Sequence, residues 1–474
     1  SVIEDMDTKQ AVFDTLESLL DPDVVIASNT SALPISHLQR GRKHPERFLG
    51  MHWAEPAHAT RFLEIIRGEL TSDAAFQTAA QLAKAIGKEP WQWPKRTLYF
   101  MSDLHADADA FFASLVASGG VKKTGPKDKD FKLTREGRRA CFLIGGDCFD
   151  KGPSTLRLLH VIRLLIDRGA NVQLLAGNHD IRMLLGIRSV GLEPDPRNDH
   201  FFIRMGRKMV PFLLEIRDHY LQGKDALKGI PNSRECRRLL YPPKSWFREF
   251  PELAAWAMPE STIEREVKKL RAKIEGFESD CERAGLSLRM VYAAVKKWHE
   301  LFLESKGEYA WFFRRMKIGY REGSFVFVHA GIDDRIARLI SEKGIKYINR
   351  KFRKQIHKDP FDFYYGPMAN IIRTKYRPVD MPLTRHGVRL LRKKSAIHAI
   401  VHGHRNLLHG QRVMLRKGIV NFECDTTLDR NSRKKEGLEG AGAAVTIFRP
   451  EGLAIGVSTD YPYIKVFESA SFHQ

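Results

Sequence analysis

The sequence predicts an α/β protein, and two observations indicate this class. Apolar runs of strand length alternate along the chain with segments whose apolar residues recur at helical spacing. Several of these runs end directly in chemically active side chains, as at Asp147 and Asp150, which follow an apolar run and two glycines. Alternating strands and helices are typical of parallel sheets covered by helices. A chain of 474 residues with 43% apolar content has room for two or three domains.

Cysteine usage and hydropathy indicate a cytoplasmic protein. The five cysteines are scattered without a C-x-x-C pair, which suits free thiols in a reducing compartment and gives no support for a disulfide framework. No apolar run approaches the roughly 20 residues that span a bilayer, so no membrane partner is expected. The N-terminus carries no signal-peptide pattern. Because the chain begins inside a predicted helix, we expect it to be a piece of a longer protein.

The chain is strongly basic, with a net charge of +21. Lysine and arginine are concentrated between Arg335 and Lys394. Such a surface attracts polyanions, so nucleic acid, nucleotides and acidic protein segments are candidate partners. The alternative is a solvated basic face that aids solubility, which we favour because no known recognition motif accompanies the charge.

Residues 1–93 carry the first α/β pattern. The expected elements are helices at 5–20 and 71–86 and strands at 24–27, 48–53 and 62–66. Thr71-Ser72-Asp73 supplies an N-cap for the second helix, and Gly87 supplies its stop. The order of these elements predicts a parallel α/β sheet.

Three groups of residues in this segment match the pattern of a known family. They are Ser28-Asn29-Thr30-Ser31, Gly50-Met51-His52, and Phe62 to Gly68. They resemble the second half of the NAD-binding domain of 3-hydroxyacyl-CoA dehydrogenases. The resemblance implies a catalytic pair, His52 and Glu64, at the family's spacing of twelve residues, with Ser31 in the same site. In that chemistry the imidazole takes a hydroxyl proton and the carboxylate holds its tautomer.

The segment also lacks parts of that family's site. No G-x-G-x-x-G occurs in residues 1–94, so the backbone cradle for the pyrophosphate is missing and we assign no cofactor-binding residue. Glu55 stands where the family usually has Asn. We therefore expect residues 1–93 to be a partial Rossmann-like segment, kept as a fusion remnant or as the end of a truncated domain. Residual NAD-dependent dehydrogenase activity is an alternative that predicts NADH binding.

Two prolines within 88–95 predict a domain boundary, after which a second domain is expected over 96–474. Five of its predicted strands end in polar side chains. The strands and the residues that follow them are 98–101 (Asp103, His105), 141–144 (Asp147, Asp150), 172–176 (Asn178, His179), 324–328 (His329) and 397–401 (His404). Closing strands are predicted at 418–423, 443–448 and 453–457, a helical insertion at about 186–322, and a basic insertion at about 335–395.

Strand ends of this kind gather at one edge of a sheet, where they build ligand sites. Imidazole, carboxylate and amide ligands without thiolate predict two divalent ions such as Mn, Fe or Zn. A strand-end carboxylate such as Asp147 can bridge two ions, and the bridged water then becomes a metal-bound hydroxide nucleophile. His179 is placed to protonate the leaving group, with Asp150 orienting it.

This series of motifs resembles the calcineurin-like metallophosphoesterases over about residues 96–460. Asp150 and the G-N-H-D form favour the phosphoprotein-phosphatase branch, which includes dinucleoside tetraphosphate hydrolases. The resemblance implies a β-sandwich flanked by helices. It assigns one metal to Asp103, His105 and Asp147, and a second to Asp147, Asn178, His329 and His404. It makes His179 and Asp150 the catalytic proton-donor pair.

The phosphate site departs from the family pattern. Lys151 stands where the branch usually has an Arg, so it supplies a charge but no bidentate fork. Lys151 and Asn178 are the assigned phosphate-binding residues, and a further Arg is expected, with Arg373 and Arg385 as candidates. Cys148 and His402 are interpreted as structural.

The sequence therefore predicts a metal-dependent phosphoric ester hydrolase that acts on a phosphomonoester or a phosphoanhydride. The substrate is expected to be a phosphorylated protein or a nucleotide. The alternative is a binding protein rather than an enzyme, in which the basic insertions bind polyanions and this binding matters more than catalysis. This alternative predicts steeply salt-dependent binding.

Overall fold

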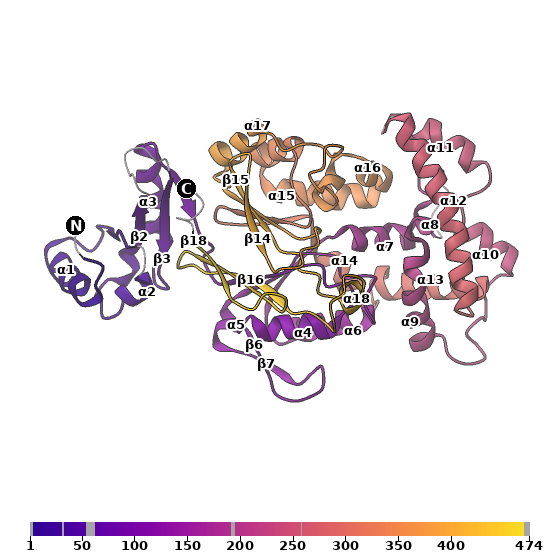
Figure 1. The fold of residues 1–474 in the computed structure, drawn as a ribbon, viewed down its shortest axis with the longest axis horizontal. Helices are drawn as coiled ribbons and strands as arrows, with labels where there is room; N and C mark the ends of the chain where they lie inside the picture. Colours follow the sequence, from indigo (N-terminus) through magenta and orange to yellow (C-terminus); the bar gives the residue numbers. More distant parts are fainter. Residues whose placement is uncertain (1–2, 31–32, 54–61, 191–194, 257, 469–474) are drawn as a thin grey trace.

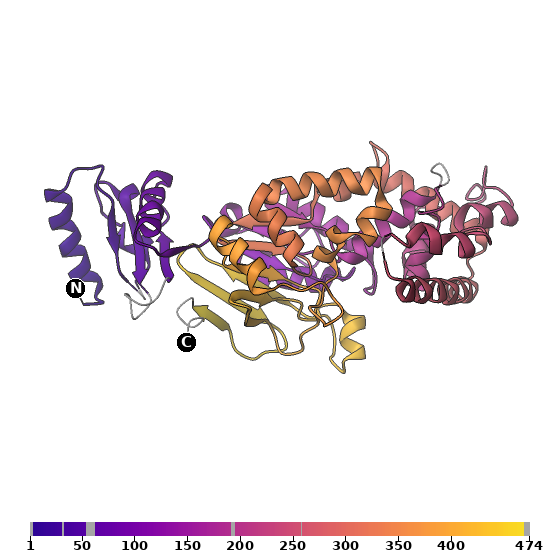
Figure 2. The ribbon, with the colours of Figure 1, turned by 90° about the horizontal axis from the view of Figure 1, so that it is seen from above.

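The computed structural model describes residues 3–30, 33–53, 62–190, 195–256 and 258–468. Three regions follow one another along the long axis of the molecule: an N-terminal unit, a central β-sandwich and a helical region (Figures 1 and 2). The mixed α/β class predicted from the sequence is confirmed. Among the described residues, no helix is both long and apolar enough to cross a membrane.

The N-terminal unit is a four-stranded sheet in the order β1-β2-β3-β4, with three helices and a 3-10 turn. Its elements are α1 (Met6–Leu19), β1 (Ile26–Ser28), α2 (Ile35–Leu38), η1 (Pro45–Arg47), β2 (Phe48–Trp53), β3 (Phe62–Arg67), α3 (Asp73–Ala85) and β4 (Glu89–Gln92). Helix α3 begins as its sequence predicts, because the Ser72 side chain accepts a hydrogen bond from the Ala75 amide at 3.1 Å.

The expected parallel sheet is wrong for one pair of strands in this unit. β1 and β2 are parallel, as are β3 and β4, but β2 runs antiparallel to β3. The cause is the length of the connection, since residues 54–61 are too few for the crossover that parallel neighbours need. Residues 88–95, predicted as a boundary, contain β4, which pairs with β3.

The central sandwich joins a seven-stranded sheet, in the order β10-β9-β8-β5-β16-β17-β18, to a five-stranded sheet, in the order β11-β12-β13-β15-β14. Its strands are β5 (Leu98–Met101), β8 (Cys141–Ile144), β9 (Asn171–Leu175), β10 (Met316–Lys317), β11 (Gly319–Glu322), β12 (Phe325–Val328), β13 (Ala399–His402), β14 (Arg412–Arg416), β15 (Ile419–Glu423), β16 (Ala444–Phe448), β17 (Leu453–Ser458) and β18 (Lys465–Glu468). A hairpin of β6 (Val121–Lys123) and β7 (Phe131–Leu133) lies beside it.

Period-two alternation explains how the two sheets pack. Leu98 and Phe100 of β5 face a core shared with Phe325 and Phe327 of β12. Tyr99 belongs instead to the core under the covering helices. The helices of this region are α4 (Ala108–Ala117), α5 (Arg135–Arg139), α6 (Thr155–Asp167), α15 (Asp334–Lys358), α16 (Pro360–Tyr365), η3 (Pro367–Ile372), α17 (Arg385–Arg389), η4 (Leu390–Lys394) and α18 (Arg430–Lys435).

Helices fill the chain between β9 and β10. They are α7 (Asn178–Ser189), α8 (Phe201–Met205), η2 (Gly206–Met209), α9 (Val210–Tyr220), α10 (Ser233–Leu240), α11 (Trp246–Ala254), α12 (Glu260–Arg283), α13 (Leu288–Leu303) and α14 (Ala310–Arg315). Most of this region projects from one end of the sandwich, at the right of Figure 1. Buried aromatic residues such as Trp246 and Trp298 hold the helices together.

Strand β4 attaches the N-terminal unit to the sandwich. The Gln92 amide donates to the Ser324 hydroxyl at 2.9 Å, and the Ser324 amide donates back to the Gln92 carbonyl at 2.8 Å. The rings of Trp91 and Trp93 lie 5.4 and 5.0 Å from Phe325 in the core between the sheets. The first 93 residues therefore contribute side chains to the sandwich core.

Candidate active site

The candidate site lies where parallel strands end. β5, β8 and β9 are parallel neighbours in one sheet, and β12 and β13 are parallel neighbours in the other. Their carboxyl ends therefore present loops at a shared edge of the sandwich. Four predicted ligands on these loops have left-handed backbone conformations: Asp103, His105, Asp147 and His404, with φ between 43° and 66°. Such conformations cost about 1–3 kcal/mol each and cluster at functional sites.

Asp103, His105 and Asp147 form the first cluster, with one ligand atom of each within 4.8 Å of the others. The His105 Nδ1–H donates to the Phe149 carbonyl at 3.2 Å, which leaves Nε2 unprotonated and facing the cluster. In this structure the Lys151 ammonium donates to that Nε2 at 2.7 Å. Burial first, and then the nearby Lys151 charge, lower the pKa of His105 to about 3, so its ring stays neutral.

Asp147, His329 and His404 form the second cluster, within the same 4.8 Å limit. The His329 Nδ1–H donates to the Gly145 carbonyl at 2.9 Å, and Nε2 lies 3.4 Å from Asp147 Oδ2. That Nε2 is also 3.2 Å from the Asn178 amide oxygen. The His404 Nε2 is buried and, among the described residues, has no hydrogen-bond partner. A cation at this point would use that orphaned lone pair.

The donor set fits divalent cations. Burial alone would lower the pKa of His329, but the Asp147 and Asp103 carboxylates outweigh burial and raise it to about 10. The cluster therefore stabilises a positive charge strongly. Neutral imidazole nitrogens, carboxylates and an amide oxygen are ligands typical of Mn, Fe and Zn sites. Asp147 belongs to both clusters, so it is the residue able to serve two ions.

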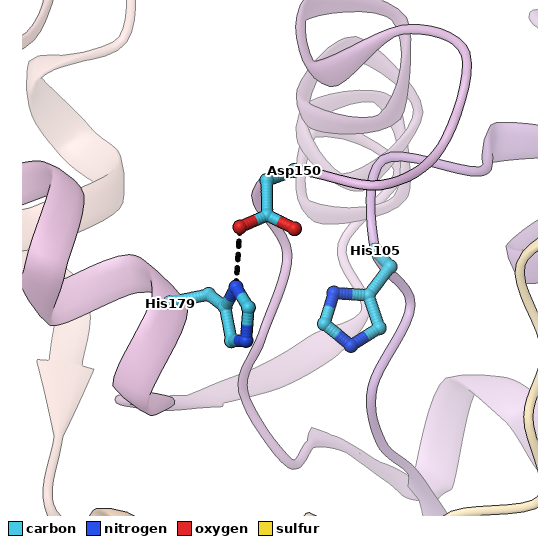
Figure 3. Close-up of side chains that lie close together, drawn as sticks. All are labelled: His105, Asp150 and His179. Carbon is cyan, nitrogen blue, oxygen red and sulfur yellow. Dashed lines mark hydrogen bonds and ion pairs between the residues drawn. The ribbon is translucent and has the colours of Figure 1, made fainter. Parts of the chain in front are cut away.

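His179 and Asp150 form a buried pair beside these clusters. The His179 Nδ1 is hydrogen-bonded to Asp150 Oδ2 (Figure 3). The His179 Nε2 lies 3.8 Å from Asp147 Oδ2. The His105 ring stands edge-on to the His179 ring, with centroids 5.0 Å apart. Burial opposes ionisation of Asp150, but the His179 charge and hydrogen bond lower its pKa to about 2. The carboxylate thus stays charged and holds one imidazole nitrogen, which leaves Nε2 for chemistry.

Asp180 is a residue of this site that sequence reasoning did not single out. Its buried carboxylate accepts the backbone amides of Asp147 and Cys148 at 2.8 Å and of Gly177 at 2.9 Å. It therefore ties the loop after β8 to the start of α7. Burial and the Asp147 charge raise the pKa of Asp180 to about 7, against these amide hydrogen bonds, which favour the carboxylate. An acidic residue two positions after Asn178 was the available signal.

The two candidate arginines occupy different places. The Arg373 guanidinium donates to the Tyr364 carbonyl at 2.7 Å, and its chain lies close to the site because the Ala330 amide donates to the Ile371 carbonyl at 2.8 Å. Arg385 is not brought to the clusters. It begins α17 on the surface and lines a basic pocket with Arg389, Arg392, Lys393, Lys417, Val388 and Glu89.

Three further residues lie around the site, of which two are buried and one is a charged lysine. His402 and Cys148 are buried, and burial lowers the pKa of His402 to about 3. Lys208, from the helical insertion, places its ammonium 4.0 Å from Asp150 Oδ2. This contact was not predictable from the sequence, because Lys208 follows no strand and belongs to no motif.

The N-terminal unit brings its predicted pair together. His52 and Glu64 face each other across β2 and β3, with Nδ1 and Oε2 3.0 Å apart. The second Glu64 oxygen accepts the Trp93 indole N–H at 2.6 Å. Ser31 and Glu55 lie outside the described residues. The carboxylate therefore links the imidazole to the segment that enters the sandwich core.

Comparison with known proteins divides the chain at the same place. Residues 1–96 match the 3-hydroxyacyl-CoA dehydrogenase, NAD binding domain, and residues 96–255 match the calcineurin-like phosphoesterase family. Both resemblances drawn from the sequence are confirmed over these residues. The fatty acid oxidation complex subunit alpha of Pseudomonas putida is 42% identical over 90 residues, which are 19% of this chain and 13% of that protein.

Two solved structures are also similar to parts of this chain. The dehydrogenase part of multifunctional enzyme 1 from C. elegans is 37% identical, covers 19% of this chain and 21% of its own, and has a TM-score of 0.19. The cold-active protein-tyrosine phosphatase of a psychrophile, Shewanella sp., is 13% identical, covers 79% and 80% of the two chains, and has a TM-score of 0.40. The chain thus spans only a small part of the curated relatives that it matches.

Proposed function

We propose that the protein is a two-metal hydrolase of phosphomonoesters or phosphoanhydrides, a function supported by the match of residues 96–255 to the calcineurin-like phosphoesterase family. One observation carries the proposal. The loops after five strands, distant in sequence, bring three histidines, two aspartates and an asparagine amide to one buried cluster centred on Asp147. A structural role alone does not require so many imidazole nitrogens to face a pair of carboxylates.

Two divalent ions would be held by this chain's side chains. Asp103, His105 and Asp147 would bind one ion, and a second would be bound by Asp147, Asn178, His329 and His404. When bound, such ions polarise the phosphoryl oxygens and lower the pKa of a water molecule so that it can act as the nucleophile. The His105 and His329 rings are already oriented for this role by their Nδ1–H bonds to backbone carbonyls.

His179 would protonate the leaving oxygen from Nε2. Asp150 holds Nδ1 and stabilises the imidazolium that a proton donor must become before it acts. The Asp147 Oδ1 accepts the backbone N–H of His179 at 2.8 Å, which fixes the donor relative to the bridging carboxylate. Lys151 would offset the charge of the phosphoryl oxygens and the Asn178 amide would bond to them, while Arg373 belongs to the segment that is hydrogen-bonded to the loop after β12.

The proposal is tested with purified protein loaded with Mn²⁺ and a generic aryl phosphate. Asp147→Asn and His179→Asn should each lower kcat by at least about 100-fold, because each removes a group that acts at the reacting centre. Metal analysis of the same samples should show reduced metal content in Asp147→Asn and normal content in His179→Asn. Normal turnover in both variants would contradict the proposed two-metal hydrolase function.

A specific pocket favours polyanion binding as a second function. Arg385, Arg389, Arg392, Lys393 and Lys417 line a pocket of about 480 Å³ together with Glu89, whose carboxylate pairs with Arg392. The excess of positive charge would attract phosphates. Binding of a single-stranded oligonucleotide should weaken steeply between 50 and about 200 mM salt. A flat salt response would count against this function.

A further inference from the structure

A pocket adjoins the proton-donor pair. It has a volume of about 320 Å³, and its lining comes from four separate parts of the chain. The lining residues are Asp150, Lys151, Lys208, Pro211, Asn406, Ser432, Lys435 and Glu436. The volume lies at the lower end of the range for small-molecule sites, so it suits a compact polar group better than a folded segment.

The charge of this pocket is predominantly positive. Lys151, Lys208 and Lys435 bring three ammonium groups, whereas the carboxylates are Glu436 and Asp150, and Asp150 is engaged by His179. Burial lowers the pKa of Lys208, and the positive charges of Arg182 and Lys151 lower it further. The negative charge of Asp150 acts in the opposite direction and raises this pKa. Ser432 and Asn406 supply neutral hydrogen-bonding groups. An anion is the ligand that this combination recognises.

The helix that supplies Lys435 and Ser432 is anchored to the sandwich. The Arg430 guanidinium, at the start of α18, bonds the Asp107 carboxylate at 2.9 and 3.0 Å. The Arg433 guanidinium, in the same helix, bonds Asp460 Oδ1 at 2.9 Å. Asn431 also donates to the Lys151 carbonyl, so α18 is tied to the loop that carries Asp150. These contacts hold the helix that carries Ser432 and Lys435 in place before a ligand arrives.

The position of the pocket decides what it would bind. Proton donation by His179 requires the leaving oxygen to lie on the His179 side of the phosphorus, and Asp150, the partner of His179, lines the pocket. A group in the pocket would therefore be attached to the leaving oxygen rather than to the attacked phosphoryl group. We propose that the pocket binds an anionic leaving group, so that the preferred substrate is a phosphoanhydride whose departing half is itself a phosphate.

This inference rests on the proposed hydrolase function and specifies its substrate class. Water would form the new P–O bond, and the bridging P–O bond would break with its electron pair remaining on the departing phosphate. That oxygen would take the His179 proton, and the second proton of water would pass to solvent. Lys208 and Lys435 would offset the charge that grows on the departing phosphate. The serine of a phosphoserine substrate leaves as a neutral alcohol and would make no use of these lysines.

The test compares inorganic tripolyphosphate with p-nitrophenyl phosphate, using the full chain and Mn²⁺ in excess over polyphosphate. The wild type should prefer tripolyphosphate in kcat/KM. Lys208→Ala and Lys435→Ala should each raise KM for tripolyphosphate by about tenfold, because a hydrogen bond to a charged group is lost, and should raise KM for the aryl ester much less. Lys208→Arg should recover most of the loss. Lys434→Ala, an exposed neighbour outside the pocket, is the matched control.

Two results would overturn the inference in different ways. Equal effects of the lysine substitutions on both substrates, or faster cleavage of an acidic phosphopeptide than of tripolyphosphate, would exclude the leaving-group role and leave the hydrolase function standing. Cleavage of neither tripolyphosphate, phosphopeptide nor aryl phosphate by protein with bound metal would overturn the hydrolase function itself. Lys434 and Lys435 are exposed and the Lys208 side chain is 48% exposed, so circular dichroism should show unchanged folding.

Discussion

Asp180 orders the site without being one of its proposed metal ligands. Its carboxylate accepts amides from two loops, and an asparagine would present an N–H₂ group to at least one of those N–H donors. Asp180→Asn should therefore destabilise the protein by about 2–4 kcal/mol and weaken metal binding, since a buried donor loses its partner. Urea unfolding and metal analysis measure the two effects.

The matched control for Asp180 is Asp218→Asn, at an exposed position on α9. It should change the free energy of unfolding by less than about 0.5 kcal/mol. If Asp180→Asn bound metal and unfolded like the wild type, the carboxylate would have no part in holding the two loops together.

Replacing Asp199 by asparagine is expected to stabilise the protein in a pH-dependent way. Burial first, and then the charges of Asp195 and Glu249, raise its pKa to about 6. The folded chain therefore holds this proton more tightly than the unfolded chain, and stability is lost as pH rises from about 4 through about 6. Asp199→Asn should stabilise the protein by about 1 kcal/mol at pH 7.5, discounted for partial exposure, and by almost nothing at pH 4.

Urea unfolding at both pH values measures this difference, with Asp225→Asn in an exposed loop as the control. An equal gain at the two pH values would show that the effect of Asp199→Asn does not come from its proton. The raised pKa arises from neighbours in the folded chain, so the sequence alone gave no sign of it.

Among individual residues, those that lie close to the end of a strand were predictable from the sequence. Asp103, Asp147 and His329 each lie within three residues of the end of an apolar run, and parallel pairing brings such positions together. Lys208 and Lys435 were not predictable, because they reach the site from helices whose packing depends on long-range contacts. Their apolar neighbours predict a helix but not which loop it will face.

Among the elements, helix α7 carries the most chemistry for its length. It begins at Asn178, directly after Gly177, and a side chain at Gly177 would place its Cβ 2.1 Å from Asp147 Oδ1 and 2.2 Å from the Asp147 amide. Gly177→Ala should therefore displace the helix start or the loop after β8. We expect kcat to fall at least about 100-fold, since even a 1 Å misplacement of a catalytic group is costly.

The control for Gly177→Ala is Gly276→Ala on α12. Gly276 lies within a helix, and a Cβ there would meet no atom within 4 Å. This substitution should leave kcat unchanged and stabilise the protein by about 0.5–1 kcal/mol, because alanine is the better helix former. Thermal unfolding and steady-state kinetics on both variants check the pair. Full activity in Gly177→Ala would mean that the loop tolerates the added methyl group.

Strands with apolar runs were predictable, and strands without them were not. β5, β8 and β12 are fully buried and lie within a residue or two of their expected bounds. β14 begins and ends in arginine, and β4 contains a proline, so neither shows the alternation of a half-buried strand. Strands β14 and β4 are recognised only because they pair with other strands, which are distant in sequence or have a different pattern of apolar residues.

For the whole molecule, the N-terminal unit matters through the two tryptophans that it contributes to the sandwich. Trp91 is 2% exposed and packs edge-on against Phe325 and stacked on His398, while Gln92 of β4 exchanges two hydrogen bonds with Ser324. These contacts mean that unfolding of the first unit uncovers the core of the second. We therefore expect the two units to unfold together rather than separately.

Trp91→Ala tests this coupling. Removing a buried indole should lower the free energy of unfolding by about 3–5 kcal/mol, and aryl phosphatase activity should be lost at the same lowered temperature as tryptophan fluorescence. Trp256→Ala, at a position 62% exposed, is the matched control and should change stability by less than about 0.5 kcal/mol. If Trp91→Ala melted in two steps, with phosphatase activity surviving the first, the N-terminal unit would be an independent attachment. A single step would show that the dehydrogenase-like segment is a structural part of the phosphoesterase-like unit.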